Sequence, residues 1–238
     1  MYPALSKAVE WCKANGVSIP DDLARDYAAL KALQDYDNIL NRLMAIFMND
    51  FGVRGNLSAL NAFEFDMKDA VTTGLTEAWR LGMRENGADE ITEEWQVELD
   101  GIIESELSHL SEFAIYLTEL AKEVTPIGDA IIQARERLSL WINRYNDVTN
   151  QAILASAEEK TKMEWIYGDT QHCTTCEQLN GIVAYAREWE EAGLSPQSPP
   201  NPLLECGGWK CQCQLIPTDK RKTRNSAERL IAIAEGAE

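Results

Sequence analysis

The sequence has little histidine, little positive charge and no long apolar run. Only 2 histidines occur in 238 residues, and 22 Lys and Arg face 39 Asp and Glu, a formal net charge of -17. Such an acidic chain repels nucleic acid and anionic membranes, so any contact with DNA must be local. No apolar run is long enough to span a bilayer, and the N-terminal residues lack the layout of a signal peptide. We therefore expect a soluble protein that is not secreted.

Cysteine is also scarce over most of the chain and concentrated in one part. Cys12 stands alone near the N-terminus, where we expect a small buried side chain. The other five fall within 41 residues: Cys173, Cys176, Cys206, Cys211 and Cys213. In a reducing cytoplasm this clustering indicates a metal or a reactive site before it indicates disulfides. A disulfide from Cys206 to Cys211 or Cys213 stays open for a protein outside the cell.

The first two thirds of the chain carry a helical pattern. Apolar residues recur at helical spacing over 27–49, and further helices are expected at about 57–85, from 92 to 123, and from the break at 124–129 to about 156. Ser18 as a cap and Pro20 in the first turn mark the start of the first of these helices. We predict a predominantly α-helical region over residues 1–157, with about four long helices.

The remaining residues, 158–238, predict a small Cys-rich α+β domain, so that the fold class is α+β. "KMEWIYG" alternates like a strand, and Asn180-Gly181 between two apolar runs predicts a hairpin. "AREWEEAG" predicts one or two helical turns, and four prolines from Pro196 to Pro202 predict an extended loop. "KCQCQLIP" predicts another strand, and the chain is expected to end in a helix.

The five clustered cysteines predict a structural zinc site. A domain of about 80 residues with a proline-rich loop buries little, so a cross-link would stabilise it. Zinc prefers four thiolate or imidazole ligands, and pairs two to four residues apart chelate it well. Cys173 and Cys176 form one pair, and Cys206 with Cys211 can form the second, with Cys213 able to replace either ligand. His172 is a further possible ligand, with an exposed loop residue as the alternative.

Three other chemistries fit the sequence less well. A thioredoxin-type CxxC belongs at a strand-to-helix turn of a βαβ unit, which the pattern lacks. A zinc deaminase needs H-x-E and P-C-x-x-C, and His172 is followed by Cys173 and Thr174. A zinc hydrolase or an HNH-type nuclease needs histidines and an open coordination position, whereas this domain has only His172. His109, on a predicted helix, has no acid and nucleophile that can be tied to it.

Residues 130 to 218 contain a series of motifs in this order: "RERLSLWINRYNDVTNQAIL", "MEWIYGDTQHCTTCEQLNG", a proline-containing loop and "KCQCQLIP". In this order of motifs the C-terminal part resembles the Mu F-like minor capsid family of phage head morphogenesis proteins. The family's elements fall on Arg144, Asn150, Trp165, Asp169, Cys173, Cys176, Leu179, Gly181, Cys211 and Cys213. Many members have a histidine where this chain has Cys176, and a Pro and His where it has Gly208, Trp209 and Lys210. A thiolate in place of an imidazole retains metal binding and weakens any case for acid-base catalysis.

The resemblance implies a non-enzymatic minor head protein of a tailed phage or prophage. Such a protein acts with the portal and with capsid or scaffolding proteins during capsid assembly and DNA packaging. It would be found in the virion, at the capsid interior or the portal vertex, and in the host cytoplasm during assembly. Two alternatives from other classes stay open: a zinc-dependent hydrolase or nuclease, and a host zinc-ribbon adaptor for protein interactions.

One short stretch of the chain is basic. Lys220, Arg221, Lys222 and Arg224, with Lys210 before them, form the one cluster suited to phosphate contact in an otherwise acidic sequence. The alternative interpretation is a solvated tail before the last helix.

Overall fold

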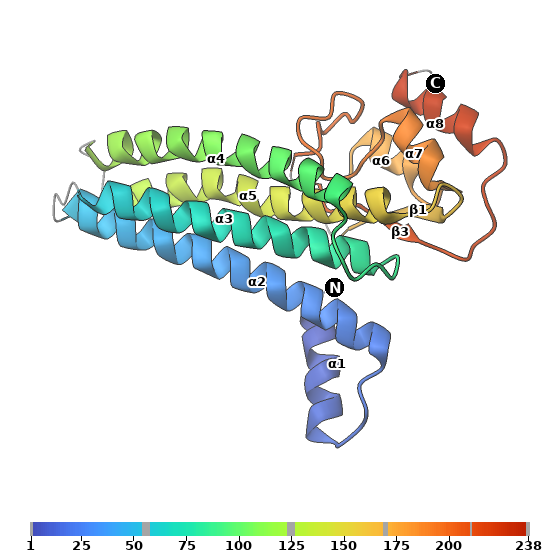
Figure 1. Ribbon diagram of the computed structural model, residues 1–238, viewed down its shortest axis with the longest axis horizontal. Coiled ribbons are helices and arrows are strands. Elements are labelled where there is room, and N and C mark those ends of the chain that lie inside the picture. The colour runs from blue at the N-terminus through green and yellow to red at the C-terminus, as the bar shows by residue number, and fades with distance from the viewer. Residues whose placement is uncertain (1, 54–57, 123–126, 169–170, 210, 237–238) are drawn as a thin grey trace. The chain divides into compact units, whose positions relative to one another are not determined.

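The computed structural model describes residues 2–53, 58–122, 127–168, 171–209 and 211–236. Most of these residues are helical, and a three-stranded antiparallel sheet lies in the C-terminal region (Figure 1), which confirms the predicted α+β class. The elements of the first part are α1 Tyr2–Ala14, α2 Asp21–Phe47, the π-helix η1 Met48–Val53, α3 Ser58–Arg84, α4 Glu93–Lys122 and α5 Ile127–Ser156. Those of the second are β1 Lys162–Ile166, α6 Thr174–Leu179, β2 Val183–Tyr185, α7 Ala186–Ala192, β3 Gln214–Pro217 and α8 Ser226–Ala234.

The four predicted long helices correspond to α2, α3, α4 and α5, and α1 is an additional helix at the N-terminus. The sequence predicts breaks at 50–56 and 124–129, but residues 50–53 belong to η1 and residues 127–129 to α5, so these parts of the prediction were wrong. Residues 54–56 and 124–126 lie outside the described residues. None of the described helices contains an apolar stretch long enough to cross a membrane. By their contacts the residues form two compact units, Met1–Val71 with Glu106–Ile142, and Thr72–Ser105 with Asn143–Glu238. Helices α3, α4 and α5 each contribute residues to both units.

Aromatic side chains run through the core of the first unit. The ring of Phe47 on α2 lies 4.8 Å from that of Phe63 on α3, and Phe63 lies 6.3 Å from Phe113 on α4. Phe113 in turn lies 5.1 Å from Trp141 on α5. All four side chains are buried, so large apolar residues at helical spacing hold these four helix segments together. Figure 1 shows the segments side by side.

The second unit is built around the small sheet, whose strand order is β2-β1-β3 with β1 in the centre. Met163 of β1 pairs with Ala184 of β2, and Glu164 pairs with Ile216 of β3. Helix α7 begins directly after β2. At its N-terminus the Glu188 carboxylate accepts a hydrogen bond from the backbone N–H of Tyr185 at 3.0 Å, which gives a partner to a backbone donor that the helix itself cannot satisfy. The helix ends at a left-handed glycine.

The C-terminal part of α5 packs within this same unit. Ile153 of α5 belongs to the apolar core of the sheet, which also contains Trp165 and Trp189 with ring centroids 5.7 Å apart. Gly82 of α3 lies against α5 so closely that a Cβ there would meet the carbonyl oxygen of Thr149 at 2.2 Å. The predicted domain boundary between residues 157 and 158 falls just after the end of α5. That the two sides of this boundary are separate domains stays a prediction.

Three local predictions were wrong. The segment before Asn180-Gly181 forms helix α6 and not a hairpin strand, because Cys173 Sγ caps it by accepting the N–H of Cys176 at 3.5 Å. The strand predicted over "KCQCQLIP" begins only at Gln214, after both of its cysteines. Helix α2 begins after Pro20, which has extended backbone angles and no side-chain cap, so Ser18 is not the cap.

Candidate metal centre

The five predicted cysteines come together from three separate segments. Cys173 precedes α6 and Cys176 lies on it, Cys206 follows the proline-rich loop, and Cys211 and Cys213 precede β3. Their sulfurs form two overlapping groups of three, Cys173 with Cys176 and Cys206, and Cys176 with Cys211 and Cys213, each with all ligand atoms within 4.8 Å of one another. Cys176 is therefore common to both groups. All five are free thiols.

This spacing fits a tetrahedral metal ion. Four sulfurs at about 2.3 Å from one zinc lie roughly 3.8 Å from each other, and the sulfurs within each group of three already lie within 4.8 Å of one another. Five sulfurs exceed the four that one such ion takes. The cluster can hold a metal ion, and the described residues alone do not fix which sulfur is left over.

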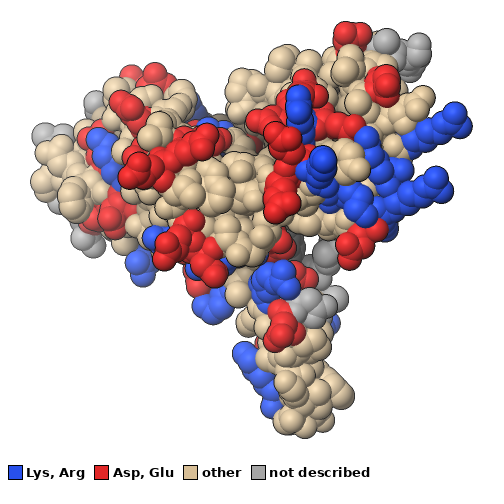
Figure 2. All heavy atoms as spheres, turned by 45° about the vertical axis from the view of Figure 1, so that its right-hand side comes forward, with Lys and Arg blue, Asp and Glu red and all other residues tan. Residues whose placement is uncertain are grey.

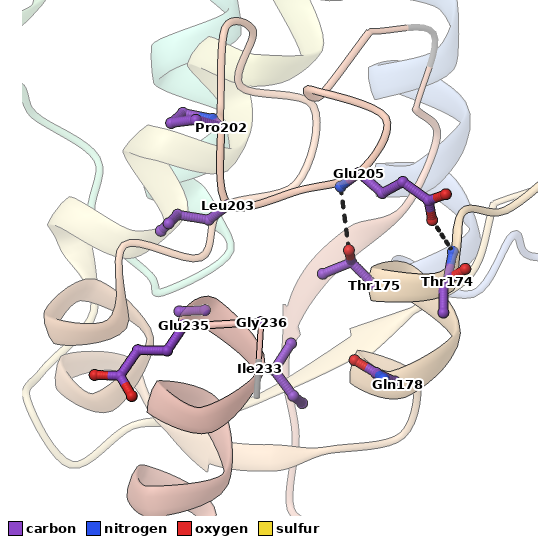
Figure 3. Close-up of a pocket in the computed structure, with 10 residues that line it drawn as sticks. Thr174, Thr175, Gln178, Pro202, Leu203, Glu205, Ile233, Glu235 and Gly236 are labelled. Carbon is purple, nitrogen blue, oxygen red and sulfur yellow. Dashed lines mark hydrogen bonds between the residues drawn. The ribbon is translucent and has the colours of Figure 1, made fainter. Parts of the chain in front are cut away.

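Hydrogen bonds between two loops bring Cys173 and Cys206 together. The backbone N–H of Thr174 donates to the Glu205 carboxylate at 2.8 Å, and the N–H of Glu205 donates to Thr175 Oγ1 at 3.1 Å (Figure 3). Thr174 follows Cys173, and Glu205 precedes Cys206. The pair of bonds thus fixes two cysteines that are 33 positions apart in sequence.

Backbone N–H groups also point at the sulfurs. The N–H groups of Cys176 and Cys206 offset the effect of burial and lower the pKa of Cys173. The N–H of Gly208 donates to Cys206, and this glycine has a φ of 80°, with no room for a Cβ, which would lie 2.9 Å from the backbone carbon of Ser198. Hydrogen bonds of this kind stabilise thiolates, which are the form that binds a metal.

The clustered thiols change the pKa values of one another. Hydrogen bonds to Cys211 and Cys213, together with burial, raise the pKa of Cys176. Bonds from Cys176 and Cys211 lower the pKa of Cys213 to about 3 in spite of its burial. Burial raises the pKa of Cys206 to about 11. The cluster therefore shares protons between neighbouring sulfurs, and a bound cation would allow all its ligands to ionise.

Two aromatic rings lie beside the cluster. His172 stacks on Tyr167 with ring centroids 3.8 Å apart and an interplanar angle of 11°. Its Nδ1 lies 3.7 Å from Cys213 Sγ, close enough for a hydrogen bond or for both atoms to bind one ion. Trp165 is fully buried, and its indole N–H, directed toward Cys213, helps to lower the pKa of that thiol. A donor beside the sulfur suits a thiolate ligand.

The sequence did not reveal the roles of Tyr167, Trp165 or Gly168 at this site. Gly168 donates its N–H to Cys213, and a Cβ on it would meet the carbonyl oxygen of Gln212 at 2.2 Å. A glycine directly after a predicted strand was the one available signal for this close approach. Asp169, which the resemblance singles out, lies outside the described residues.

The residues that carry the resemblance to the capsid family, where the structure describes them, make identifiable contacts. Trp165 and Leu179 are fully buried, and Gly181 has a φ of 77° in the turn between α6 and β2. On α5, the side chain of Arg144 forms an ion pair with that of Asp147, which is fully buried. The Asn150 side chain donates to the carbonyl oxygen of Pro196 at 3.5 Å. Each of these residues has a packing, turn or anchoring contact.

Two hollows in the described part of the chain carry no recognisable set of catalytic groups. One, of about 550 Å³, lies between α6, the proline-rich loop and the end of α8, and of its two carboxylates, Glu205 and Glu235, the first already bonds to Thr174 (Figure 3). The other, of about 430 Å³, is lined by several carboxylates and by Trp95. Burial, then Glu190 and Glu94, raise the pKa of Glu98 there. Neither hollow is lined by a histidine or cysteine among the described residues.

The predicted phosphate-contacting residues lie apart from the cysteines in the chain. Lys220, Arg221, Lys222 and Arg224 all fall on the connection between β3 and α8, and Lys210 lies outside the described residues. His109 is exposed on α4, and no described residue forms a catalytic set with it. Comparison of the chain with protein-family models, with curated proteins and with solved structures finds no match.

Proposed function

We propose that this protein is a structural minor capsid and head morphogenesis protein of a tailed phage or prophage. It acts with the portal and with capsid or scaffolding proteins in capsid assembly and DNA packaging, and it is not an enzyme. It resides in the virion, at the capsid interior or portal vertex, after a stage in the host cytoplasm. The observation that carries the proposal is one small domain that combines a buried Trp strand, a CxxC, an Asn-Gly turn and a CxC whose sulfurs converge.

The proposal includes a structural zinc ion held by four of the clustered cysteines. Thiolate ligands in a tetrahedron suit zinc, and the strands of this domain are only three to five residues long. A sheet of that size gains little stability from its own hydrogen bonds and needs packing or a cross-link. The candidate ligands from three chain segments would supply that cross-link.

A structural role is favoured over hydrolysis by the surroundings of the cluster. Catalytic zinc sites keep a position open for water or substrate, whereas sites with four cysteine ligands are usually closed. Here Cys176, Cys211 and Cys213 are buried, and the number of sulfurs exceeds the number of coordination positions. The neighbouring His172 stacks on Tyr167, and the sulfur within reach of its Nδ1 is that of Cys213, itself a candidate metal ligand.

Two measurements test the proposal. Elemental analysis of the purified full chain is expected to give one zinc per chain, and iron would show as visible absorption from thiolate ligation. The assembly role is tested by co-expressing the chain with the portal protein encoded near it, with an unrelated portal as control. Selective co-purification supports the role. A gene neighbourhood without portal or terminase, combined with no portal binding, would favour the adaptor alternative.

A further inference from the structure

The connection between β3 and α8, residues 218–225, is held firmly against the sheet, and we call it the basic loop. The N–H of Thr218 donates to the carbonyl oxygen of Lys162 on β1 at 2.9 Å. The N–H of Thr223 donates to the carbonyl oxygen of Val183 on β2 at 2.8 Å, and Val183 N–H donates back to Thr223 Oγ1 at 2.9 Å. The loop is thus attached to two strands and has a defined position within the second unit.

Two lysines of the basic loop are used to support it. Lys220 Nζ lies 2.7 Å from the carboxylate of Glu164, a side chain only 8% exposed. Lys222 Nζ lies 2.5 Å from the carboxylate of Glu188 and 4.5 Å from the centre of the Tyr185 ring. Each lysine pairs with a carboxylate that is mostly out of solvent, although the side chain of Lys220 is itself 66% exposed and that of Lys222 is 32% exposed.

The two arginines of the basic loop differ from its lysines in that neither is paired with a carboxylate of the described residues. Arg221 and Arg224 are exposed, and the described residues provide no ion pair or hydrogen bond for either guanidinium. Figure 2 shows Lys and Arg side chains gathered on one side of the C-terminal unit. Of the nearby acids, Asp219 and Glu228 are exposed. Arginine binds phosphate through two parallel N–H bonds, which makes it the better of the two basic residues for this contact.

We propose that the basic loop is a contact surface for the phosphate backbone of nucleic acid, with Arg221 and Arg224 as the contacting residues. Lys220 and Lys222, whose ammonium groups are paired with Glu164 and Glu188, then mainly position the loop. Of the four basic residues predicted from the sequence, two would contact the ligand and two would chiefly support the structure. This goes beyond the assembly role proposed above, and the two arginines are not among the clustered candidate metal ligands.

A nucleic acid fits this small patch better than a protein or membrane surface does. Duplex DNA presents about one negative charge per 1.7 Å of its axis, so a short basic loop can reach two phosphates. A membrane or a broad acidic protein surface would also approach the rest of this chain, whose net charge is -17. At physiological salt, charges interact over about 8 Å, which favours a narrow, highly charged partner that touches the loop alone.

The size of the effect follows from the number of contacts. Two phosphate contacts give a slope of about -2 for the logarithm of affinity against the logarithm of salt concentration. A fourfold rise in salt, from about 50 to 200 mM, then weakens binding by about tenfold. Removal of both arginines is expected to bring the slope close to zero, since each lost contact removes about one unit.

The test is fluorescence anisotropy of a labelled 20-base-pair duplex of mixed sequence, with the zinc-loaded full chain at 20 to 200 mM salt. The double variant R221A/R224A is expected to bind at least about tenfold more weakly at low salt, with an unchanged melting temperature. R221K/R224K keeps the charges and is expected to keep most of the salt slope. R42A/R80A, which removes two exposed arginines from helices α2 and α3, is the matched control and is expected to bind like the wild type.

Other results would overturn the proposal. Undetectable binding of the wild type at 20 mM salt would do so, as would equal binding by R221A/R224A and the wild type. Equally tight binding of polyglutamate or of vesicles containing phosphatidylserine, lost in the same double variant, would show a general anion surface or a different partner. Lys222→Ala adds a structural check: it is expected to lower the melting temperature, whereas an unchanged melting temperature with lost DNA binding would make Lys222 a contact residue.

Discussion

Replacement of Cys176 is expected to remove the metal from this protein more completely than replacement of any other cysteine. Cys176 is the one sulfur present in both groups of three, and its side chain is 1% exposed. Without it the remaining sulfurs fall into two pairs, Cys173 with Cys206, and Cys211 with Cys213. Without Cys206, by contrast, Cys176, Cys211 and Cys213 keep their arrangement, and His172 Nδ1, 3.7 Å from Cys213 Sγ, can serve as a fourth ligand.

The magnitudes separate a metal effect from a packing effect. Truncating one buried cysteine to alanine removes apolar area equivalent to about 1 kcal/mol. Structural zinc sites bind with an apparent free energy of about 10–16 kcal/mol at neutral pH, most of which is available for folding. Cys176→Ala is therefore expected to lose stoichiometric zinc and to unfold the sheet of the second unit. Cys206→Ala is expected to retain about one zinc per chain.

The assay is zinc content by elemental analysis, followed by denaturant unfolding with and without a chelator. Cys12→Ala is the matched control, since Cys12 is also buried but lies on α1, and it is expected to keep its zinc. A wild-type zinc content and chelator sensitivity in Cys176→Ala would refute the reasoning from the shared sulfur. Equal zinc loss in Cys206→Ala and Cys176→Ala would refute it as well, because it would show that Cys176 has no special position.

Two further predictions concern the structure around this centre. Burial raises the pKa of Glu188, but hydrogen bonds from Lys222, the Tyr185 N–H and Ser226 outweigh it and lower this pKa. The stability that these hydrogen bonds provide is therefore present above about pH 4.3 and is lost as the pH falls through the lowered pKa of Glu188. Denaturant unfolding between about pH 6 and 3, at equal zinc, should therefore show a smaller acid loss in Glu188→Gln than in the wild type, and parallel curves would contradict this. Gly168→Ala is expected to destabilise the protein by about 1–3 kcal/mol or more, because the new Cβ clashes with the backbone of Gln212. The control is Gly101→Ala on α4, where no atom lies within 4 Å and the substitution should stabilise the protein by about 0.5–1 kcal/mol. Equal melting temperatures for the two variants would argue against the close approach of Gly168 to Gln212.

The helices of the first part could be predicted because their pattern is set by long stretches of sequence. On α5, for example, Ala134, Leu138, Tyr145 and Val148 follow one face, and all four are buried. The short elements could not be predicted in the same way. Asn180-Gly181 favours a hairpin locally, but Cys176 and Leu179 three residues apart both enter the core, which is helical spacing, and the Cys173 sulfur caps that helix.

The candidate site was predictable in its residues and not in its geometry. Five cysteines within a small domain are enough to indicate a metal. Their grouping depends on contacts that no local pattern encodes, such as the bonds of Glu205 to Thr174 and Thr175 that bring Cys206 to Cys173. The basic loop shows the same limit. Its four basic residues look equivalent in sequence, and only the positions of Glu164 and Glu188 distinguish the lysines from the arginines.

Ile153 of α5 and the candidate ligands Cys176, Cys211 and Cys213 belong to the same apolar core beside the small sheet. Gln197 Nε2 donates to the carbonyl oxygen of Cys213 at 2.8 Å, and the adjoining Pro196 accepts from Asn150 of α5, so one loop connects a candidate ligand to the helix. Ile153 of α5 is buried in the sheet's core, a contribution of about 1.5–3 kcal/mol by area. A metal bound by the cysteines would hold the loops that carry its ligands but would not replace the apolar contact of Ile153. The proposed metal and α5 would therefore contribute in complementary ways, with α5 needed for the core of the sheet in either case.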